Sequence, residues 1–367
     1  TPFLDALVGR FCSQPDLFVT QGLSITAWAI TTLEADGARH PHFYRVLEIE
    51  ATRRLAEFNQ QSLSNIAWCF ATANVHVPSL FKAIANATVA IQDEMLPQSL
   101  HNVLWAFARQ SYAHDRLFSS LMPRIIANAN QMTPQSLVGT VWAYAALGYS
   151  APRLFRAFAI EAHRRLPELS AQGLANLGWA YAVVDVQGSE VDQLFEDGAF
   201  AERCRIVIAD AKSFGVDGSR SKYKEHLRQL HQWELWRRVR ASEAVQRGGR
   251  AWPPVSEELR SACARVFAST AGRPSQFQRQ VLDGVLALGI AAEEEVLTQE
   301  GYSLDIVLPH SLPADLADTL ERIEQSKPAA AHRSGEDATA ATRGRKGSSD
   351  GGGDAYACGE QAKEAGA

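Results

Sequence analysis

The sequence lacks several features that define common functional classes. No apolar run reaches the length of about 18 residues that a membrane-spanning helix needs, so we expect no membrane association. The cysteines are odd in number, widely scattered and without any C-x-x-C spacing, which argues against a disulfide framework or a zinc site. We expect them to be buried thiols in a reducing compartment. They are Cys12, Cys69, Cys204, Cys263 and Cys358.

Catalytic constellations are also missing. The histidines, His226 and His231 among them, have no partner cysteine, serine or carboxylate cluster at catalytic or ligand spacing. The glycine-containing segment Ser213–Ser219 matches neither a phosphate-binding loop nor a dinucleotide fingerprint and is interpreted as a loop. The sequence therefore predicts a protein that is not an enzyme and that has no catalytic residue, metal or cofactor.

The sequence lacks the excess of positive charge that a nucleic-acid binder usually needs to neutralise phosphates, because its net charge is −5. Residues 1–190 are close to neutral, with thirteen basic and fourteen acidic side chains. Residues 220–250 differ, since nine basic residues face only three acids there and aromatic residues are interspersed among them. This basic stretch suits a phosphate backbone with stacked bases, and equally a solvated helix whose tryptophans pack on the last repeat.

The sequence opens at Thr1 without a methionine and enters patterned sequence at once. We therefore expect a fragment whose N-terminal part, with any targeting segment, is not included. Its localisation cannot be deduced directly from the residues.

What the sequence does contain is an internal repeat. Five segments align without gaps, each opening with Gln-(Ser/Gly)-Leu and carrying a tryptophan seven positions after the glutamine. The tryptophans are separated by 40, 37, 37 and 37 positions and are interpreted as structural residues of the repeat: Trp28, Trp68, Trp105, Trp142 and Trp179.

Each repeat predicts a pair of helices, A and B. Helix A begins at a capping signal, as at Thr133-Pro134 and Ser170. With the glutamine as position 0, the apolar residues at +2, +5 and +9 fall within about 60° of one another and predict a core face. Glutamine, the +4 residue and tryptophan form a second stripe on the opposite side. A helix specified on two faces is expected to be sandwiched between neighbouring repeats.

The predicted fold class is therefore all-α: an α-solenoid of hairpins of about 37 residues, followed by a helical region and a truncated α/β segment. We expect the repeat array to span 1–200 and a basic, aromatic helical region to span 201–292. A partial α/β segment is expected at 293–325. A tail too poor in apolar residues to fold is expected at 326–367.

The unit Pro-Gln-Ser-Leu-x-x-x-x-Trp-Ala-x-Ala, followed by a helix with a Pro/Leu-aromatic opening, resembles the octotricopeptide repeat of organellar RNA-binding proteins. The opening of helix B, Val77–Phe81 and Ala151–Phe155, indicates a divergent branch. Residues 229–236, 274–281, 294–296 and 301–309 resemble the beginning of a RAP domain, which also ends the FAST-kinase-like RNA proteins. After Pro309 the sequence departs from that domain. Only Asp305 could belong to the acidic set of a RAP-type nuclease.

The resemblance implies a single-stranded RNA-binding protein of a chloroplast or mitochondrion, acting in RNA maturation, stability or translation. Its partners would be an organellar transcript or rRNA and other organellar RNA-processing proteins. Because a solenoid varies its reading residues, positions +3 and +4 are the predicted base contacts. The predicted RNA-binding residues are Ser24, Ser64, Asn65, His101, Asn102, Asn176, Arg220, Lys222, Lys224, Arg237, Arg238 and Arg240.

Two alternatives remain at this point. A protein-interaction scaffold fits an α-solenoid of net charge −5 equally well. A RAP-type RNA nuclease is the weakest of the three.

Overall fold

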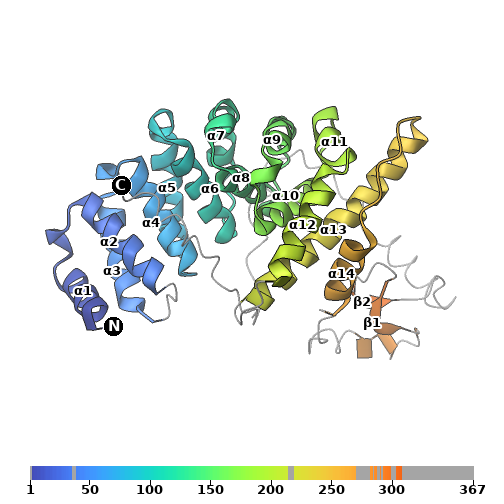
Figure 1. Ribbon diagram of the computed structural model, residues 1–367. Helices are drawn as coiled ribbons and strands as arrows, with labels where there is room; N and C mark the ends of the chain where they lie inside the picture. Colours follow the sequence, from blue (N-terminus) through green and yellow to red (C-terminus); the bar gives the residue numbers. More distant parts are fainter. Residues whose placement is uncertain are drawn as a thin grey trace, which may run out of the picture. The chain divides into compact units, whose positions relative to one another are not determined.

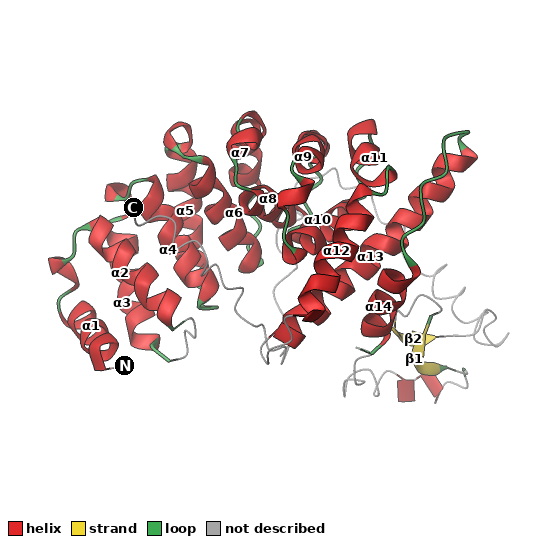
Figure 2. Cartoon of the chain, viewed as in Figure 1, coloured by secondary structure: helices red, strands yellow, loops and turns green. Residues whose placement is uncertain are grey.

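The computed structural model describes residues 2–34, 39–213 and 219–269, together with 282–283, 285–286, 290, 292–298 and 303–307. Contacts divide the chain into two units, one comprising Thr1–Cys263 and the other beginning at Ala264. The first unit consists of stacked helical hairpins and confirms the all-α repeat architecture (Figures 1 and 2). The boundaries predicted from sequence at 200, 292 and 325 remain predictions.

The helices of the first unit follow one another in the order of the repeats. They are α1 (Pro2–Ser13), α2 (Thr20–Leu33), α3 (Pro41–Arg53), α4 (Gln60–Thr72), α5 (Pro78–Ala90), α6 (Pro97–Arg109), α7 (Asp115–Ala127), α8 (Pro134–Ala146), α9 (Pro152–Arg164), α10 (Ala171–Val184), α11 (Ser189–Glu196), α12 (Ala199–Ser213), α13 (Ser219–Gln246) and α14 (Glu257–Ala268). A short 3₁₀ turn, not predicted from sequence, follows each of the B helices α1, α3, α5, α7 and α9.

The repeats form two layers, which can be followed in Figure 1. The A helices α2, α4, α6, α8 and α10 pack on one another in sequence order, and α13 extends this A layer by packing on α10. The B helices α1, α3, α5, α7, α9 and α11 form the second layer. Each A helix from α4 to α10 thus has one face on the B layer, two sides against neighbouring helices of the A layer, and one face left open, whereas α2 has one such neighbour, α4.

Capping residues set the helix starts as predicted. Thr133 Oγ1 accepts a hydrogen bond from the Ser136 amide at 3.1 Å, and Ser170 Oγ accepts one from the Gly173 amide at 3.1 Å. Asn59 caps α4 in the same way. Proline occupies the first turn of α3, α5 and α9, where its missing N–H leaves no bond unmade.

In four of the five repeats the turn from helix A to helix B has a left-handed residue at position +13, whereas Glu34 in the first repeat has a φ of −143°. The backbone φ is +54° at Asn74, +51° at Ser111, +71° at Gly148 and +50° at Asp185. In the first three of these repeats the amide at +14 donates to the carbonyl at +9, which closes the end of helix A. Only one of the four positions is glycine, so three repeats accept the steric cost of this conformation.

The core lies between the layers and uses the predicted positions. The +9 side chains are fully or almost fully buried, and where they are tyrosine the hydroxyl donates to a carbonyl of helix B. Tyr144 donates to Phe118 O at 2.7 Å and Tyr181 to Phe155 O at 2.6 Å. Each of these buried aromatic side chains contributes about 1.5–3 kcal/mol through removal from water.

The sides of the A helices pack through small residues. Positions +1 and +8 hold only glycine, serine, alanine or cysteine, and they lie about 90° from the open face. Across one such contact Ser24 Oγ donates to Ser62 Oγ at 3.0 Å. Across another, the His101 ring lies against Gly139.

An arginine closes the entry of four repeats. Its guanidinium donates to the backbone carbonyl three residues before the repeat's glutamine. The arginine itself lies near the end of the second helix of the repeat or beyond that end. The pairs are Arg54 with Phe18, Arg124 with Met95, Arg165 with Met132 and Arg203 with Leu169. We call these the arginine clasps.

The second unit contains a two-stranded antiparallel sheet of β1 (Glu293–Leu297) and β2 (Ser303–Val307). Glu293 pairs with Val307 and Leu297 with Ser303. The backbone of Asp305 lies in β2. The predicted tail at 326–367 lies outside the described residues.

A candidate nucleic-acid interface on the A layer

The open face of the A layer is formed by positions 0, +4, +7 and +11 of the five A helices, which we call the A-face stripe. At about 100° per residue these positions lie within about 60° of one another and opposite the core face. Most of their side chains are partly or fully exposed. The sequence-based expectation that this stripe is sandwiched between repeats is therefore wrong. The sides of the helix are sandwiched, and the stripe is left open.

The +3 residues do not belong to this open face. Ser24 and Ser64 are each 1% exposed and His101 is 6% exposed. Ser24 and Ser64 donate to the carbonyls of Gln21 and Gln61. The expectation that +3 contacts a nucleotide fails for this reason, because a +3 side chain lies between adjacent A helices.

The +4 residues are placed where a ligand could reach them. Asn65, Asn102 and Asn176 are partly exposed. Asn102 Oδ1 accepts a hydrogen bond from Gln98 Nε2 at 3.0 Å, and Asn176 Oδ1 accepts one from Gln229 Nε2 of α13 at 3.0 Å. These bonds orient the two amides, since each fixes the oxygen and leaves the nitrogen as donor.

The glutamine at position 0, which sequence reasoning took as a constant feature, links two repeats. Gln98 Oε1 accepts a hydrogen bond from Ser136 Oγ at 2.8 Å, while its nitrogen holds Asn102. The chain Ser136–Gln98–Asn102 therefore ties an exposed amide to the next A helix. The repeat of glutamine and serine at fixed spacing was the available signal for this link.

The tryptophans occupy two environments. Trp68 is 7% exposed, whereas Trp28, Trp105, Trp142 and Trp179 are partly exposed. They stand at equivalent places on successive A helices, as the repeat interpretation requires. Burial supports the predicted packing role for Trp68. The other four tryptophans are only partly buried.

The A-face stripe is almost free of charge. Its twenty side chains include no carboxylate and one cation, Arg109, in a chain whose net charge is −5. A polyanion on this face meets no like charge on the stripe, and its attraction must come from hydrogen bonds and stacking.

The basic stretch of α13 has a different role from the one predicted. The Arg237 side chain is buried, donates to Phe195 O at 3.3 Å and to Pro253 O at 2.6 Å, and faces the rings of Trp233 and Trp252. Burial lowers the pKa of its guanidinium. The prediction that Arg237 binds phosphate is therefore corrected, because its donors are occupied inside the fold.

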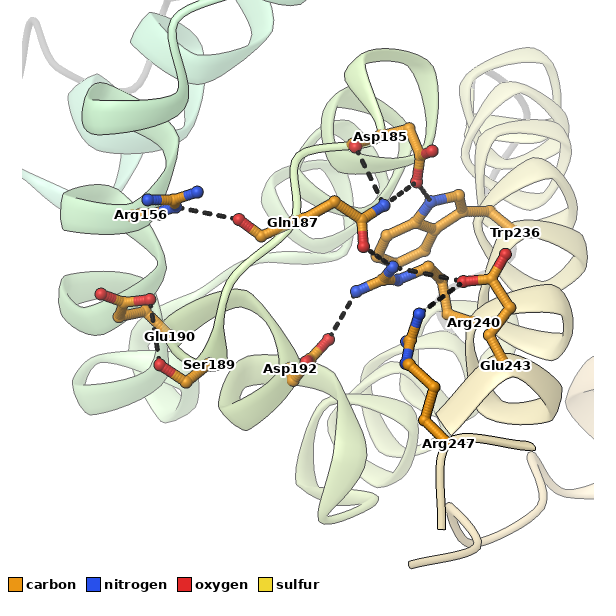
Figure 3. Close-up of polar contacts among 10 residues, drawn as sticks. All are labelled: Arg156, Asp185, Gln187, Ser189, Glu190, Asp192, Trp236, Arg240, Glu243 and Arg247. Carbon is orange, nitrogen blue, oxygen red and sulfur yellow. Dashed lines mark hydrogen bonds and ion pairs between the residues drawn. The ribbon is translucent and has the colours of Figure 1, made fainter. Parts of the chain in front are cut away.

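Arg240 is also part of the fold, as Figure 3 shows. Its guanidinium is 3% exposed, donates to Asp192 Oδ1 at 2.9 Å and bonds Gln187 Oε1. One turn earlier, Trp236 Nε1 donates to Asp185 Oδ1 at 2.7 Å. These contacts fasten α13 to the turn between α10 and α11, so the phosphate role predicted for Arg240 is corrected as well.

Two predicted basic residues remain exposed. Lys224 is exposed on α13, and Arg238 has an exposed side chain that pairs with Glu234 Oε1 at 3.3 Å. Arg220 and Lys222 lie in α13, but their side chains are outside the described part of the structure. The electrostatic part of the predicted interface is thus smaller than the nine basic residues of 220–250 suggest.

Within the described residues, no group of three or more His, Cys, Asp or Glu side chains could hold a metal ion. The helices of that same part include none that is long and apolar enough to span a membrane. Its free cysteines Cys69, Cys204 and Cys263 are buried, Cys12 is partly exposed, and Cys358 lies outside it.

Stacked hairpins of similar length, an open A face with a single charged residue and a helix that packs on the last A helix define a helical-repeat protein of the α-solenoid class. A family model described as RESC6, RNA-editing substrate-binding complex 6 protein, matches residues 29–242, more than half of the chain. The chain belongs to this family. The matching family is neither the octotricopeptide repeat nor the RAP family, whose motifs the sequence resembles. No curated protein sequence matches the chain.

Proposed function

We propose that this protein is a non-catalytic subunit of an RNA-editing machinery and that it binds single-stranded RNA along its A-face stripe. The family supports a role in RNA processing as part of an editing complex, and it favours the mitochondrion over the chloroplast. The observation that carries the proposal is the A-face stripe itself, which repeats an amide and an indole on successive helices. Both groups suit the bases of an unpaired strand.

The same features argue for binding without chemistry. RNA lying on the stripe would meet amides, indoles, aliphatic side chains, two threonine hydroxyls and Arg109, none of which is an effective general acid or base at neutral pH. We further propose that the binding is sequence-selective, because the +4 residue differs between repeats. RNA bound along the stripe would be protected from nucleases or kept unpaired.

A second candidate function, a protein-interaction scaffold, is favoured by large apolar side chains that are exposed in and before the first repeat. Phe3 is 77% exposed, Leu17 65%, and Val19 and Leu33 each 69%. Exposed apolar side chains of this size can contribute to protein contacts. This region does not overlap the repeats around Asn102, so an editing subunit could use both.

Filter binding of the full chain to a randomised pool of single-stranded RNA, repeated over a salt series, tests the proposal. We expect saturable binding whose affinity falls only gently with salt. A slope of log K against log salt of about −2 would correspond to three phosphate contacts on a single strand. Absence of saturable RNA binding at low salt would leave the scaffold as the function.

A further inference from the structure

We infer that Trp28, Trp105, Trp142 and Trp179 form a stacking ladder on which a single-stranded RNA stacks one base on each of these four indoles. This inference rests on the proposed function and assigns the group that holds each base. Sequence reasoning had favoured a packing role for all five tryptophans of the repeat.

The aromatic side chains at positions +7 and +9 of helix A differ in their exposure to solvent. At +9 the aromatic side chains Phe107 and Tyr144 are 0% and 2% exposed and fill the core between the layers. At +7, Trp105 and Trp142 are partly exposed. The core is thus already supplied with an aromatic residue at +9 in four of the five repeats, and the partly exposed indole on the open face is available for a ligand.

Each indole at +7 lies beside the residue at +4 of the same helix, which is an asparagine in three of the five repeats. Positions +4 and +7 are separated by about 60° and one turn, so they are neighbours on the helix surface. Asn102 therefore stands beside Trp105, with its oxygen held by Gln98 and its nitrogen left as donor. A base stacked on Trp105 would present its edge to this donor, which selects a base with a carbonyl or ring-nitrogen acceptor.

The repeats differ in what they offer beside the indole. Asn65, Asn102 and Asn176 supply an amide, whereas Ile25 and Gly139 supply none. The base on Trp142 would therefore be held by stacking alone and would tolerate any identity. The base on Trp105 would be discriminated.

Charge and regularity identify the occupant as a nucleic acid. The stripe has no carboxylate to repel phosphates, and four of its five repeats present a partly exposed indole. On other helical-repeat readers the bases of a strand are likewise held one at a time by successive repeats. A flat aromatic unit at each step is a property of an RNA strand, and few protein segments share it. A proline-rich peptide, which can also lie on indoles, is the rival occupant.

The test uses the full chain and a fluorescein-labelled single-stranded RNA selected from the randomised pool, with binding followed by anisotropy. Two double variants are compared: Trp105→Phe with Trp142→Phe, which keeps two aromatic faces, and Trp105→Leu with Trp142→Leu, which keeps apolar volume only. We expect the phenylalanine pair to bind within about threefold of the unaltered protein. We expect the leucine pair to lose at least about 25-fold, or about fivefold for each stacked base.

Trp68→Leu is the matched control, because Trp68 has the same repeat position but is 7% exposed. It should change RNA affinity by less than about twofold. Circular dichroism of each variant verifies that the helices are retained. If the leucine pair fails to fold, the unaltered protein is measured against an abasic oligonucleotide of the same length, which keeps phosphates and loses bases.

The outcomes separate the two claims. Equal affinity of the leucine and phenylalanine pairs, or equal affinity for the abasic strand, overturns the ladder while the RNA-binding function stands. Displacement of the RNA by a proline-rich peptide at comparable concentration also overturns it. Failure of the unaltered protein to bind any RNA overturns the proposed function itself.

Discussion

The imidazole ring of His101 lies directly against the backbone of Gly139 in the following repeat. A Cβ atom on Gly139 would stand 2.2 Å from Cε1 of His101, closer than two carbon atoms can approach. This pair joins α6 to α8 at a point where the +3 residue of one repeat meets the +4 residue of the next. At the other three interfaces a smaller +3 residue, serine or valine, is followed by asparagine at +4 of the next repeat, as in Ser64 and Asn102. The two positions are therefore complementary in size.

Gly139→Asn should destabilise the protein by about 2 kcal/mol, because the new side chain overpacks the contact with His101. Combining it with His101→Ser copies the preceding interface and should recover most of the loss. Urea unfolding of both single variants and the double variant measures the coupling. Gly9→Ala is the control, since a Cβ there meets no atom within 4 Å. Additive effects of the two changes would contradict size complementarity.

Acid should weaken the protein through His101. Burial lowers the pKa of this imidazole from 6.5 to about 4, so the unfolded chain takes up a proton at a pH where the folded chain does not. Stability from this group is complete above pH 6.5 and falls as the pH drops toward 4, by up to about 3 kcal/mol. The His101→Gln variant should show a shallower loss between these values in thermal unfolding across pH. Parallel curves for the two proteins would refute the assignment.

Position +13 offers a stabilising substitution. Ser111 holds a φ of +51°, which costs a residue with a Cβ about 1 kcal/mol relative to glycine. Ser111→Gly should therefore raise the free energy of unfolding by about 0.5 kcal/mol, after the greater entropy of glycine in the unfolded chain is subtracted. Gly148→Ala, at the same position of the next repeat with φ of +71°, should lower it by about 1 kcal/mol. Chemical denaturation of the two variants checks the opposite signs.

Replacing Arg240 should lower stability, whereas replacing Arg238 should affect RNA binding and leave stability nearly unchanged, although the two residues are only two positions apart. Arg240→Met leaves the Asp192 carboxylate without its buried partner and should cost about 3 kcal/mol of stability. Arg238→Met removes an exposed ion pair with Glu234 and should change stability by less than about 0.5 kcal/mol. If Arg238 contacts phosphate, its loss should reduce the salt slope of RNA binding by about 0.7. An unfolding midpoint unchanged in Arg240→Met would contradict the structural role.

The period of the tryptophans predicted the helix pairs. The residues within each repeat predicted the caps at Thr133 and Ser170 and core positions such as Leu100 and Tyr144. Those features depend on residues close in sequence and on the geometry of a single helix. The sides of helix A depend instead on how one hairpin is rotated against the next. The burial of Ser24 and His101 could therefore not be predicted from one repeat alone.

The positions of Arg237 and Arg240 within the basic stretch could not be predicted for a related reason. The partners of Arg240 and Trp236 are Asp192 and Asp185, which lie 48 and 51 residues earlier in the chain. A count of local charge contains no information about such partners. Lys224 and Arg238, whose neighbours are mostly solvent, are the basic residues for which the count remained informative.

The arginine clasps have a consequence for how the length of this protein can change. Donor and acceptor of each clasp lie 29 to 36 residues apart and within one repeat, as in Met95 with Arg124 and Met132 with Arg165. Excising or duplicating one complete hairpin would leave every other clasp intact. Evolution can in this way add or remove reading units without redesigning the ones that stay, provided that α13 still finds Asp185 and Asp192 at the final turn.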